Sequence, residues 1–161
     1  MTRKLAHMPP LRLRGQAAEI GAAVDAVRRF ALAEGLAAVA ADALVVAVDE
    51  AISNILLHAY DALAEPAVTI EATADCQAIE VVLVDDGRPF NPLEQLPPAL
   101  EGGAADRPVG GLGIHIMRSL VDGLEYCRDG TANRLVLRKR RIAPLAAKGA
   151  GSEDGPDSAG A

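Results

Sequence analysis

The segment VDEAISNILLHAY, from Val48 to Tyr60, constrains the fold most, because it joins a nearly continuous apolar run to a few polar side chains at helical spacing. Glu50, Asn54 and His58 are four residues apart, and Glu50 and Asn54 lie within about 40° of one another on a helix. Most of the remaining circumference is Val, Leu, Ile and Ala, so the helix is predicted to be largely buried. Its narrow polar stripe then faces either solvent, the commoner case for a single helix, or a cavity.

Residue patterns predict helices and strands along the rest of the chain. Helical spacing predicts helices over 16–33, 41–62 and 111–122. Alternating or β-branched runs predict strands over 11–15, 67–74, 78–87, 124–130 and 133–140, the last two joined by a turn at Asp129-Gly130. Clustered strands around clustered helices favour an α+β fold, a two-layer sandwich in which about three helices cover one face of a mixed, mostly antiparallel sheet.

The domain boundaries follow from composition. The length of 161 residues suits one domain. We expect an N-terminal extension over 1–10, a folded domain over 11–143, and a disordered tail over 144–161, which is rich in Ala, Gly, Ser and acidic residues. Prolines and glycines interrupt any regular pattern over 88–109, and so long a loop inside a compact domain is often a functional lid.

Charge and composition exclude several classes of function. A net charge of −6 and an aromatic content of 2% leave neither a phosphate-neutralising field nor stacking platforms, so no nucleic-acid partner is expected. The basic run over 138–141 is interpreted as a solvated strand end. No apolar stretch is long enough to span a bilayer, and the N-terminus lacks the apolar centre of a signal peptide. Two cysteines form no disulfide framework, so we expect a cytoplasmic protein with no membrane partner.

A second candidate site is the strand end VLVDDGRPF, residues 82–90. A carboxylate fixed there, that of Asp85, can accept a hydrogen bond from an exocyclic amine, and Gly87 lets a flat ring approach the backbone. The alternative is a strand that runs into an ordinary Asp-Gly turn.

A third candidate site is VGGLGIHIMRSLVD, residues 109–122, in which Gly110, Gly111 and Gly113 precede a helix. Free N–H groups and the positive end of the helix dipole suit such a junction to phosphate binding. The pattern lacks the Lys-Ser/Thr pair of a Walker A loop and the third spaced glycine of a Rossmann fingerprint. A glycine-rich hinge without a ligand remains the alternative.

Taken in order, the acid–amide helix, the Asp-x-Gly strand end, the long loop and the glycine-rich helix start resemble the GHKL superfamily of gyrase, the ninety-kilodalton heat-shock chaperone, histidine kinases and MutL. The resemblance covers roughly 11–141 and is closest to the anti-sigma-factor serine/threonine kinases. It rests on Glu50-Ala-Ile-Ser-Asn54 with His58-Ala-Tyr60, on Asp85-Asp86-Gly87-Arg88-Pro89, and on Gly111-Leu112-Gly113. It implies a Bergerat-type ATP-binding fold. Pro89 stands where many members have glycine, which favours the anti-sigma branch and a stiffer lid.

The resemblance also implies roles for individual residues. Glu50 would be the catalytic base, and Asn54 would give an amide oxygen to Mg²⁺. Asp85 would accept a hydrogen bond from the adenine amine, with Gly87 making room for the ring. The phosphates of ATP would be bound by the glycine-rich start of the third helix, with Arg107 as a lid cation unless it is simply solvated. The residues of that start are Gly110, Gly111, Leu112 and Gly113.

The resemblance implies a serine/threonine protein kinase that acts as an anti-sigma factor. Such a protein would bind a sigma factor, phosphorylate a small anti-anti-sigma protein and work as a homodimer. Two alternatives remain open. The chain could be an ATP-binding regulatory module that transfers nothing, or a detached histidine-kinase catalytic domain acting in trans. His58 is interpreted as a packing or capping residue, and His115 as half exposed beside the buried stripe of its helix.

Overall fold

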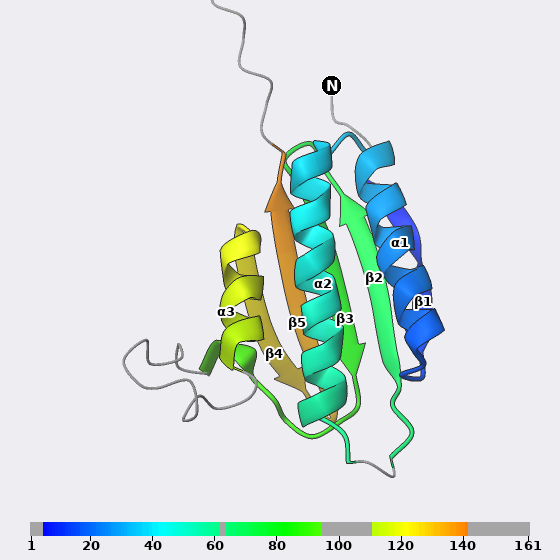
Figure 1. Cartoon of the computed structure of the whole chain (residues 1–161), viewed down its shortest axis with the longest axis vertical. Coiled ribbons are helices and arrows are strands. Elements are labelled where there is room, and N and C mark those ends of the chain that lie inside the picture. Colours follow the sequence, from blue (N-terminus) through cyan, green and yellow to red (C-terminus); the bar gives the residue numbers. More distant parts are fainter. Residues whose placement is uncertain (1–4, 62–63, 95–110, 142–161) are drawn as a thin grey trace, which may run out of the picture.

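The computed structural model describes residues 5–61, 64–94 and 111–141, which form two layers (Figure 1). One layer is a five-stranded sheet in the order β1-β2-β3-β5-β4, and three helices cover one of its faces. The strands are β1 Ala6–Leu13, β2 Val68–Ala74, β3 Ala78–Asp85, β4 Gly123–Asp129 and β5 Ala132–Arg140. The helices are α1 Ala17–Ala33, α2 Ala38–His58 and α3 Gly111–Leu120, with a short 3₁₀ turn, η1, at Pro92–Glu94.

The predicted α+β sandwich is confirmed, with one correction to the sheet. We expected a mixed sheet, whereas all four pairings between the described strands are antiparallel. The chain can make this sheet without a parallel pair because β2 and β3, like β4 and β5, are joined by short turns, and β5 pairs antiparallel with β3.

The first strand begins earlier than predicted, so residues 6–10 belong to β1 and not to an N-terminal extension. The prediction was wrong because Pro9 and Pro10 interrupt the strand pattern. In the structure they lie where the register shifts, between Met8, which pairs with Ala72, and Leu11. Proline is tolerated there because β1 is an edge strand and residues at a bulge need no ladder N–H.

The middle helix, α2, also differs from its predicted bounds of 41–62, because it begins three residues earlier and ends at His58. Its last turn is held by the N–H of Ala59, which donates to the carbonyl of Ile55. The carbonyl of Ala59 then accepts the N–H of Arg88 at 2.8 Å, so the chain after β3 satisfies a backbone group that a longer helix would satisfy itself. The third helix ends at Leu120, two residues before its predicted end.

The core lies between the helices and the sheet. Leu44, Val48 and Ile52 of α2 are fully buried, as are Ile70 of β2 and Leu83 of β3. Along β2, buried positions alternate with half-buried or exposed ones, which is the pattern of a sheet that meets a core on one face and water on the other. No helix in the described ranges combines the length and the apolar composition needed to cross a membrane.

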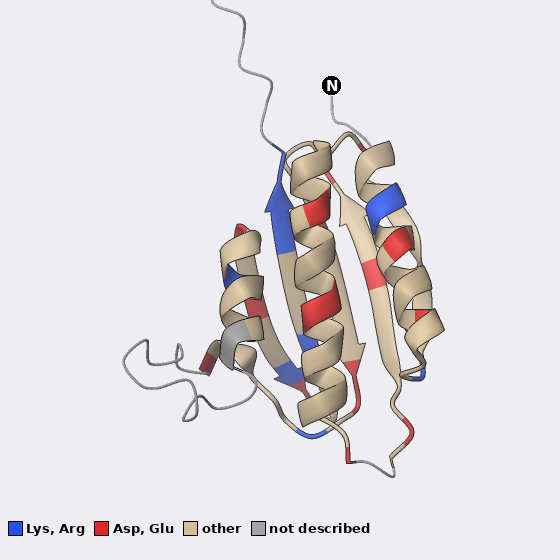
Figure 2. Cartoon of the chain, in the orientation of Figure 1, with Lys and Arg blue, Asp and Glu red and all other residues tan. Residues whose placement is uncertain are grey.

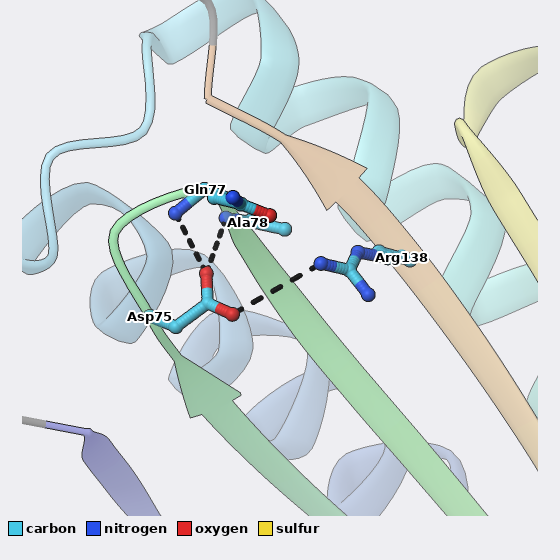
Figure 3. Close-up of polar contacts among 4 residues, drawn as sticks. All are labelled: Asp75, Gln77, Ala78 and Arg138. Carbon is cyan, nitrogen blue, oxygen red and sulfur yellow. Dashed lines mark hydrogen bonds and ion pairs between the residues drawn. The ribbon is translucent and has the colours of Figure 1, made fainter.

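Different structural elements meet at the two ends of the sheet. The C-terminal end of α2, the end of β3 and the start of α3 lie at one end of the molecule (Figure 1). The β2–β3 turn lies at the other end, where Asp75 organises the backbone (Figure 3). Its Oδ1 accepts the N–H groups of Gln77 and Ala78, both at 2.7 Å, and its Oδ2 lies 4.0 Å from a guanidinium nitrogen of Arg138. These hydrogen bonds hold the pKa of the Asp75 carboxyl below its usual value.

We predict that Asp75→Ala lowers the free energy of unfolding by about 0.5–1 kcal/mol at pH 7, a modest loss because the turn is open to solvent. A carboxyl whose pKa is lowered by folding stabilises the protein above its unfolded pKa, and this contribution is lost as the pH falls through the lowered folded pKa. Urea unfolding of both proteins at pH 7 and near pH 3 should therefore show a difference that shrinks in acid. A difference of equal size at the two pH values would contradict this account of the turn.

Candidate functional site

Glu50 and Asn54 form a hydrogen-bonded pair on the side of α2 that faces α3. The Asn54 Nδ2 donates to Glu50 Oε1 at 2.9 Å and to the Glu50 carbonyl at 2.7 Å. Asn54 is only 5% exposed, and Glu50 is half-buried. Both of these bonds use the amide nitrogen, and no hydrogen bond within the described residues ends on Asn54 Oδ1. Asn54 therefore faces the interior and Glu50 lies at its edge, with a carboxylate and an amide oxygen presented side by side.

Gly113 brings the start of α3 against this pair. A Cβ added to Gly113 would lie 1.7 Å from Glu50 Oε1 and 2.3 Å from the carboxyl carbon, so the carboxylate occupies the space that a side chain would need. Gly113 belongs to the first turn of α3, where unpaired N–H groups and the helix dipole favour a negative charge. The acid–amide pair and the glycine-rich junction, far apart in the sequence, thus meet directly.

Asp85 ends β3 as a buried carboxylate. It is 4% exposed, and its Oδ1 accepts the Nδ2 of Asn133 at 2.8 Å and the N–H of Gly87 at 2.9 Å. Within the described residues no hydrogen bond ends on Oδ2. Burial raises the pKa of Asp85, and the two hydrogen bonds only partly oppose it. Burying a carboxylate costs free energy, and here one of its oxygens accepts no hydrogen bond from the described residues. Both features are typical of a functional site.

Asn133 is the functional residue that sequence reasoning missed. It lies directly opposite Asp85 in the β3–β5 register. Its Nδ2 donates to Asp85 and to the carbonyl of Arg88 at 2.9 Å, while its Oδ1 accepts the hydroxyl of Tyr126 at 2.7 Å and a guanidinium N–H of Arg128 at 2.6 Å. The sequence held no local signal for it, because the Asp129-Gly130 turn fixes only the β4–β5 register, and the pairing of β5 with β3 joins segments far apart in the chain.

Gly87 has a packing role in the structure. A Cβ at this position would lie 2.6 Å from the carbonyl oxygen of Ala59 and 2.7 Å from its Cβ. The lack of a side chain therefore lets the chain after β3 approach the end of α2. Its predicted role beside a flat ring stays a prediction.

A small cavity lies between Asn54 of α2 and the Asp85–Asn133 pair. It holds about 10 Å³, roughly one water molecule, and Asn54 and Asp85 both line it, together with Phe90, Met117 and Asn133 among others. Phe90 also stacks on His58, with ring centroids 4.6 Å apart and planes at 19°. The packing role predicted for His58 is thus confirmed, and His115, expected to be half exposed, is exposed. Phe90 lies in the first residues of the predicted lid over 88–109, so a ligand larger than a water molecule fits between Asn54 and Asp85 only if the cavity widens.

A larger cavity of about 810 Å³ opens elsewhere along the end of the sheet. Arg12, Arg14, Glu65 and Thr69 line it, and it touches Asp85 from another side. Asn54 lines only the smaller cavity, and Glu50 and Gly113 line neither. Because both basic and acidic side chains line this cavity, its charges favour neither an anionic nor a cationic ligand. We therefore assign the candidate site to the smaller cavity.

The remaining predicted residues are only partly covered. Arg107 and Gly110 lie outside the described residues, as do 95–109 of the predicted lid and the predicted tail over 144–161. Gly111 and Leu112 form the start of α3. In the described ranges, no group of three or more His, Cys, Asp and Glu side chains could hold a metal ion.

The arrangement of a buried acid–amide helix, a strand-terminal aspartate and a glycine-rich helix start, on a two-layer sandwich, defines an ATP-binding domain of the GHKL type. The histidine kinase-like ATPase domain family matches residues 13–139. The chain belongs to this family, and the predicted resemblance is confirmed.

Individual relatives agree with the narrower resemblance. The chain is 27% identical over 95 residues to the anti-sigma F factor of Clostridium beijerinckii, and 29% identical over 94 residues to the serine/threonine-protein kinase BtrW of Bordetella bronchiseptica. Each match covers 58% of this chain and 66% of the relative, so the chain spans just under two thirds of each relative's length.

One solved structure supports the fold. The crystal structure of the RsbU and RsbW domains of Rv1364c from Mycobacterium tuberculosis superposes with a TM-score of 0.57 at 14% identity, covering 85% of this chain and 34% of that one.

We predict that Asp85→Asn leaves the protein as stable as the wild type or more stable at pH 7, while nucleotide affinity falls at least tenfold. An amide keeps the Oδ1 acceptor for Asn133 and Gly87, removes the cost of a buried charge, and replaces the unused acceptor by a donor. A carboxyl whose pKa is raised by folding favours the folded state at low pH and loses this as the pH rises, so the gain should disappear in acid.

Thermal unfolding and titration with a fluorescent ATP analogue measure the two effects. Asp86→Asn is the matched control, because Asp86 is exposed and, among the described residues, its side chain accepts a hydrogen bond only from the Tyr60 hydroxyl. Equal nucleotide affinity in the Asp85 and Asp86 variants would remove Asp85 from the site.

Proposed function

We propose that the chain is an ATP-dependent serine/threonine protein kinase that acts as an anti-sigma factor in a partner-switching circuit. In this proposal it binds a sigma factor, phosphorylates a small anti-anti-sigma protein on a serine or threonine, and works as a homodimer. The observation that carries the proposal is the position of the Glu50 carboxylate, which lies beside the Asn54 amide and against Gly113 at the start of α3.

The donor groups fit Mg·ATP, which would supply a phosphoryl group whose charge the metal partly neutralises. Asn54 is suited to the metal because its Oδ1 is an oxygen ligand not engaged by other described residues, and the remaining ligands would come from phosphates and water. Asp85 is suited to an exocyclic amine because its Oδ2 is an unused acceptor. The backbone N–H groups at the start of α3 are suited to phosphate oxygens.

Glu50 would act on the substrate hydroxyl. As the hydroxyl oxygen forms its bond to the terminal phosphorus, the bond from phosphorus to the leaving oxygen of ADP breaks, and the hydroxyl proton passes to Glu50 Oε1 or Oε2. Asn54 orients this carboxylate through its hydrogen bond. A protein that only binds nucleotide has no need of a base beside the phosphate site, which favours transfer over mere binding.

The relatives support the narrower part of the proposal. One bears the name anti-sigma F factor and another the name serine/threonine-protein kinase. The acid–amide spacing of four residues and the Asp-Gly-x-Pro-Phe sequence point to the same branch.

The first test is Glu50→Gln, assayed with radiolabelled ATP, Mg²⁺ and small antagonist domains from the source genome. We expect acid-stable phosphate on serine or threonine with the wild type, a loss of 10²–10⁴-fold with the variant, and nearly unchanged nucleotide affinity. Asp25→Asn, the same change at an exposed position of α1, serves as control. Unchanged phosphorylation by the Glu50 variant would reject the assigned role.

The same assay separates the alternatives. Acid-labile phosphate on histidine would indicate a detached histidine-kinase domain. Normal ATP binding without any transfer would indicate a regulatory module.

A second test uses Gly113→Ala. The added methyl group would take the space of the Glu50 carboxylate, and since that group is the end of a flexible side chain, the fold can accommodate the change by moving it. We expect stability within about 1 kcal/mol of the wild type, because alanine also favours the helix, but a loss of phosphoryl transfer as large as that of Glu50→Gln. Gly21→Ala in α1 is the control, since nothing lies within 4 Å of its added Cβ. Full activity of the Gly113 variant would contradict the role of this contact.

A further inference from the structure

Exposed apolar side chains gather on the helical layer beside Glu50. Five large apolar residues are exposed among those described, and four of them belong to α2 or α3. Their exposed fractions are 84% for Val39, 49% for Val46, 64% for Leu57 and 37% for Ile116, while the fifth, Leu5, precedes β1. Apolar groups concentrated on one face mark an interaction surface more often than groups scattered singly.

Three of these residues form a line along α2. At 100° per residue, Val39, Val46 and Leu57 lie within about 20° of one another and within about 40° of Glu50. From Val46 to Leu57 the line is about 16 Å long, and the level of Glu50 lies between them. We call Val39, Val46 and Leu57 the α2 ridge. It passes the carboxylate at the α2–α3 contact, with Ile116 one turn beyond Gly113 on the neighbouring helix.

The outward surface around the α2 ridge is acidic. Asp42 and Asp49 are exposed on the same helix, and acidic positions mark the outward side of α2 in Figure 2. Asp42 pairs with Arg28 of α1 at 2.8 Å, whereas Asp49 has no ion pair within the described residues. The surface thus offers apolar contact next to negative charge.

This combination of apolar and acidic side chains favours one kind of binding partner for the α2 ridge over others. A second copy placed face to face on the α2 ridge would bring Asp49 and Glu50 near the same residues of its partner, and like charges across an interface oppose association. An anionic lipid surface would be repelled in the same way. A segment with apolar side chains flanked by lysine or arginine satisfies both features.

We infer that the α2 ridge and Ile116 form the docking surface for the protein substrate, which presents its serine or threonine between apolar side chains and a nearby lysine or arginine. The inference rests on the proposed function, because it takes Glu50 as the place of transfer. It adds the surface that brings the hydroxyl there and the chemistry of the segment that this surface accepts.

The test uses two fluorescent serine peptides of equal length, one with leucine and lysine around the serine and one in which glutamate replaces the lysines. Anisotropy titrations with the full chain should give at least fivefold tighter binding of the leucine–lysine peptide, weakening as salt is added. Val46→Ser with Leu57→Ser should weaken binding at least fivefold, and Asp49→Lys should reverse the preference between the peptides. Leu5→Ser and Asp25→Lys, matched changes away from the surface, should change neither result.

Each outcome decides the inference. No binding of the leucine–lysine peptide, no preference between the peptides, or an equal effect of Leu5→Ser overturns it. Peptide binding does not require phosphoryl transfer, so binding as expected without any phosphorylation would reject the proposed function and leave the docking surface in place. If the Val46 and Leu57 variant phosphorylates an antagonist domain with an unchanged KM, the docking surface is rejected and the proposed function stands.

Discussion

The burial of α2 is the constraint on which the rest of the structure depends. Its inner side is made of fully buried Leu44, Val48 and Ile52, and small residues such as Ala47 and Ala51 let neighbouring elements approach. This packing fixes the rotation of the helix, and the rotation in turn points Asn54 inward and Glu50 toward α3. The same rotation leaves the α2 ridge facing outward. The positions of Glu50 and Asn54 in the candidate site therefore follow from how apolar side chains pack on the opposite side of one helix.

The other half of the site is built at the expense of stability. Asp85 is a buried carboxylate whose charge costs free energy, and the structure compensates with a second buried residue, Asn133, which is itself held by Tyr126 and Arg128. Among the described residues, both hydrogen bonds to the Asp85 carboxylate end on Oδ1. A purely structural aspartate would satisfy both oxygens, so this asymmetry is better explained by a ligand than by the fold.

The sequence predicted what local patterns determine. The helical spacing of residues 48–60 indicated α2, and the turn at Asp129-Gly130 indicated β4 and β5. It could not predict features that depend on distant contacts. Pro9 and Pro10 hid the start of β1, because only the pairing with β2 shows that they lie at a bulge on an edge strand. Likewise, the role of Asn133 can be recognised only when the strand register places it opposite Asp85. The packing role of Gly87 can be recognised only when the end of α2 is seen to lie against it.

The closed state of the cavity links nucleotide binding to the same helix. Phe90 lines the cavity beside Asp85 and stacks on His58, which is the last residue of α2. A purine ring is many times larger than the space of about 10 Å³, so the residues that line the cavity, Phe90 among them, would have to move before a purine could lie there. Such a stack is worth about 0.5–1.5 kcal/mol, which a nucleotide's own contacts readily exceed. His58 lies one residue beyond Leu57 of the α2 ridge. In the proposed function α2 would therefore carry the nucleotide site on one side and the substrate surface on another, which couples the two through a single helix.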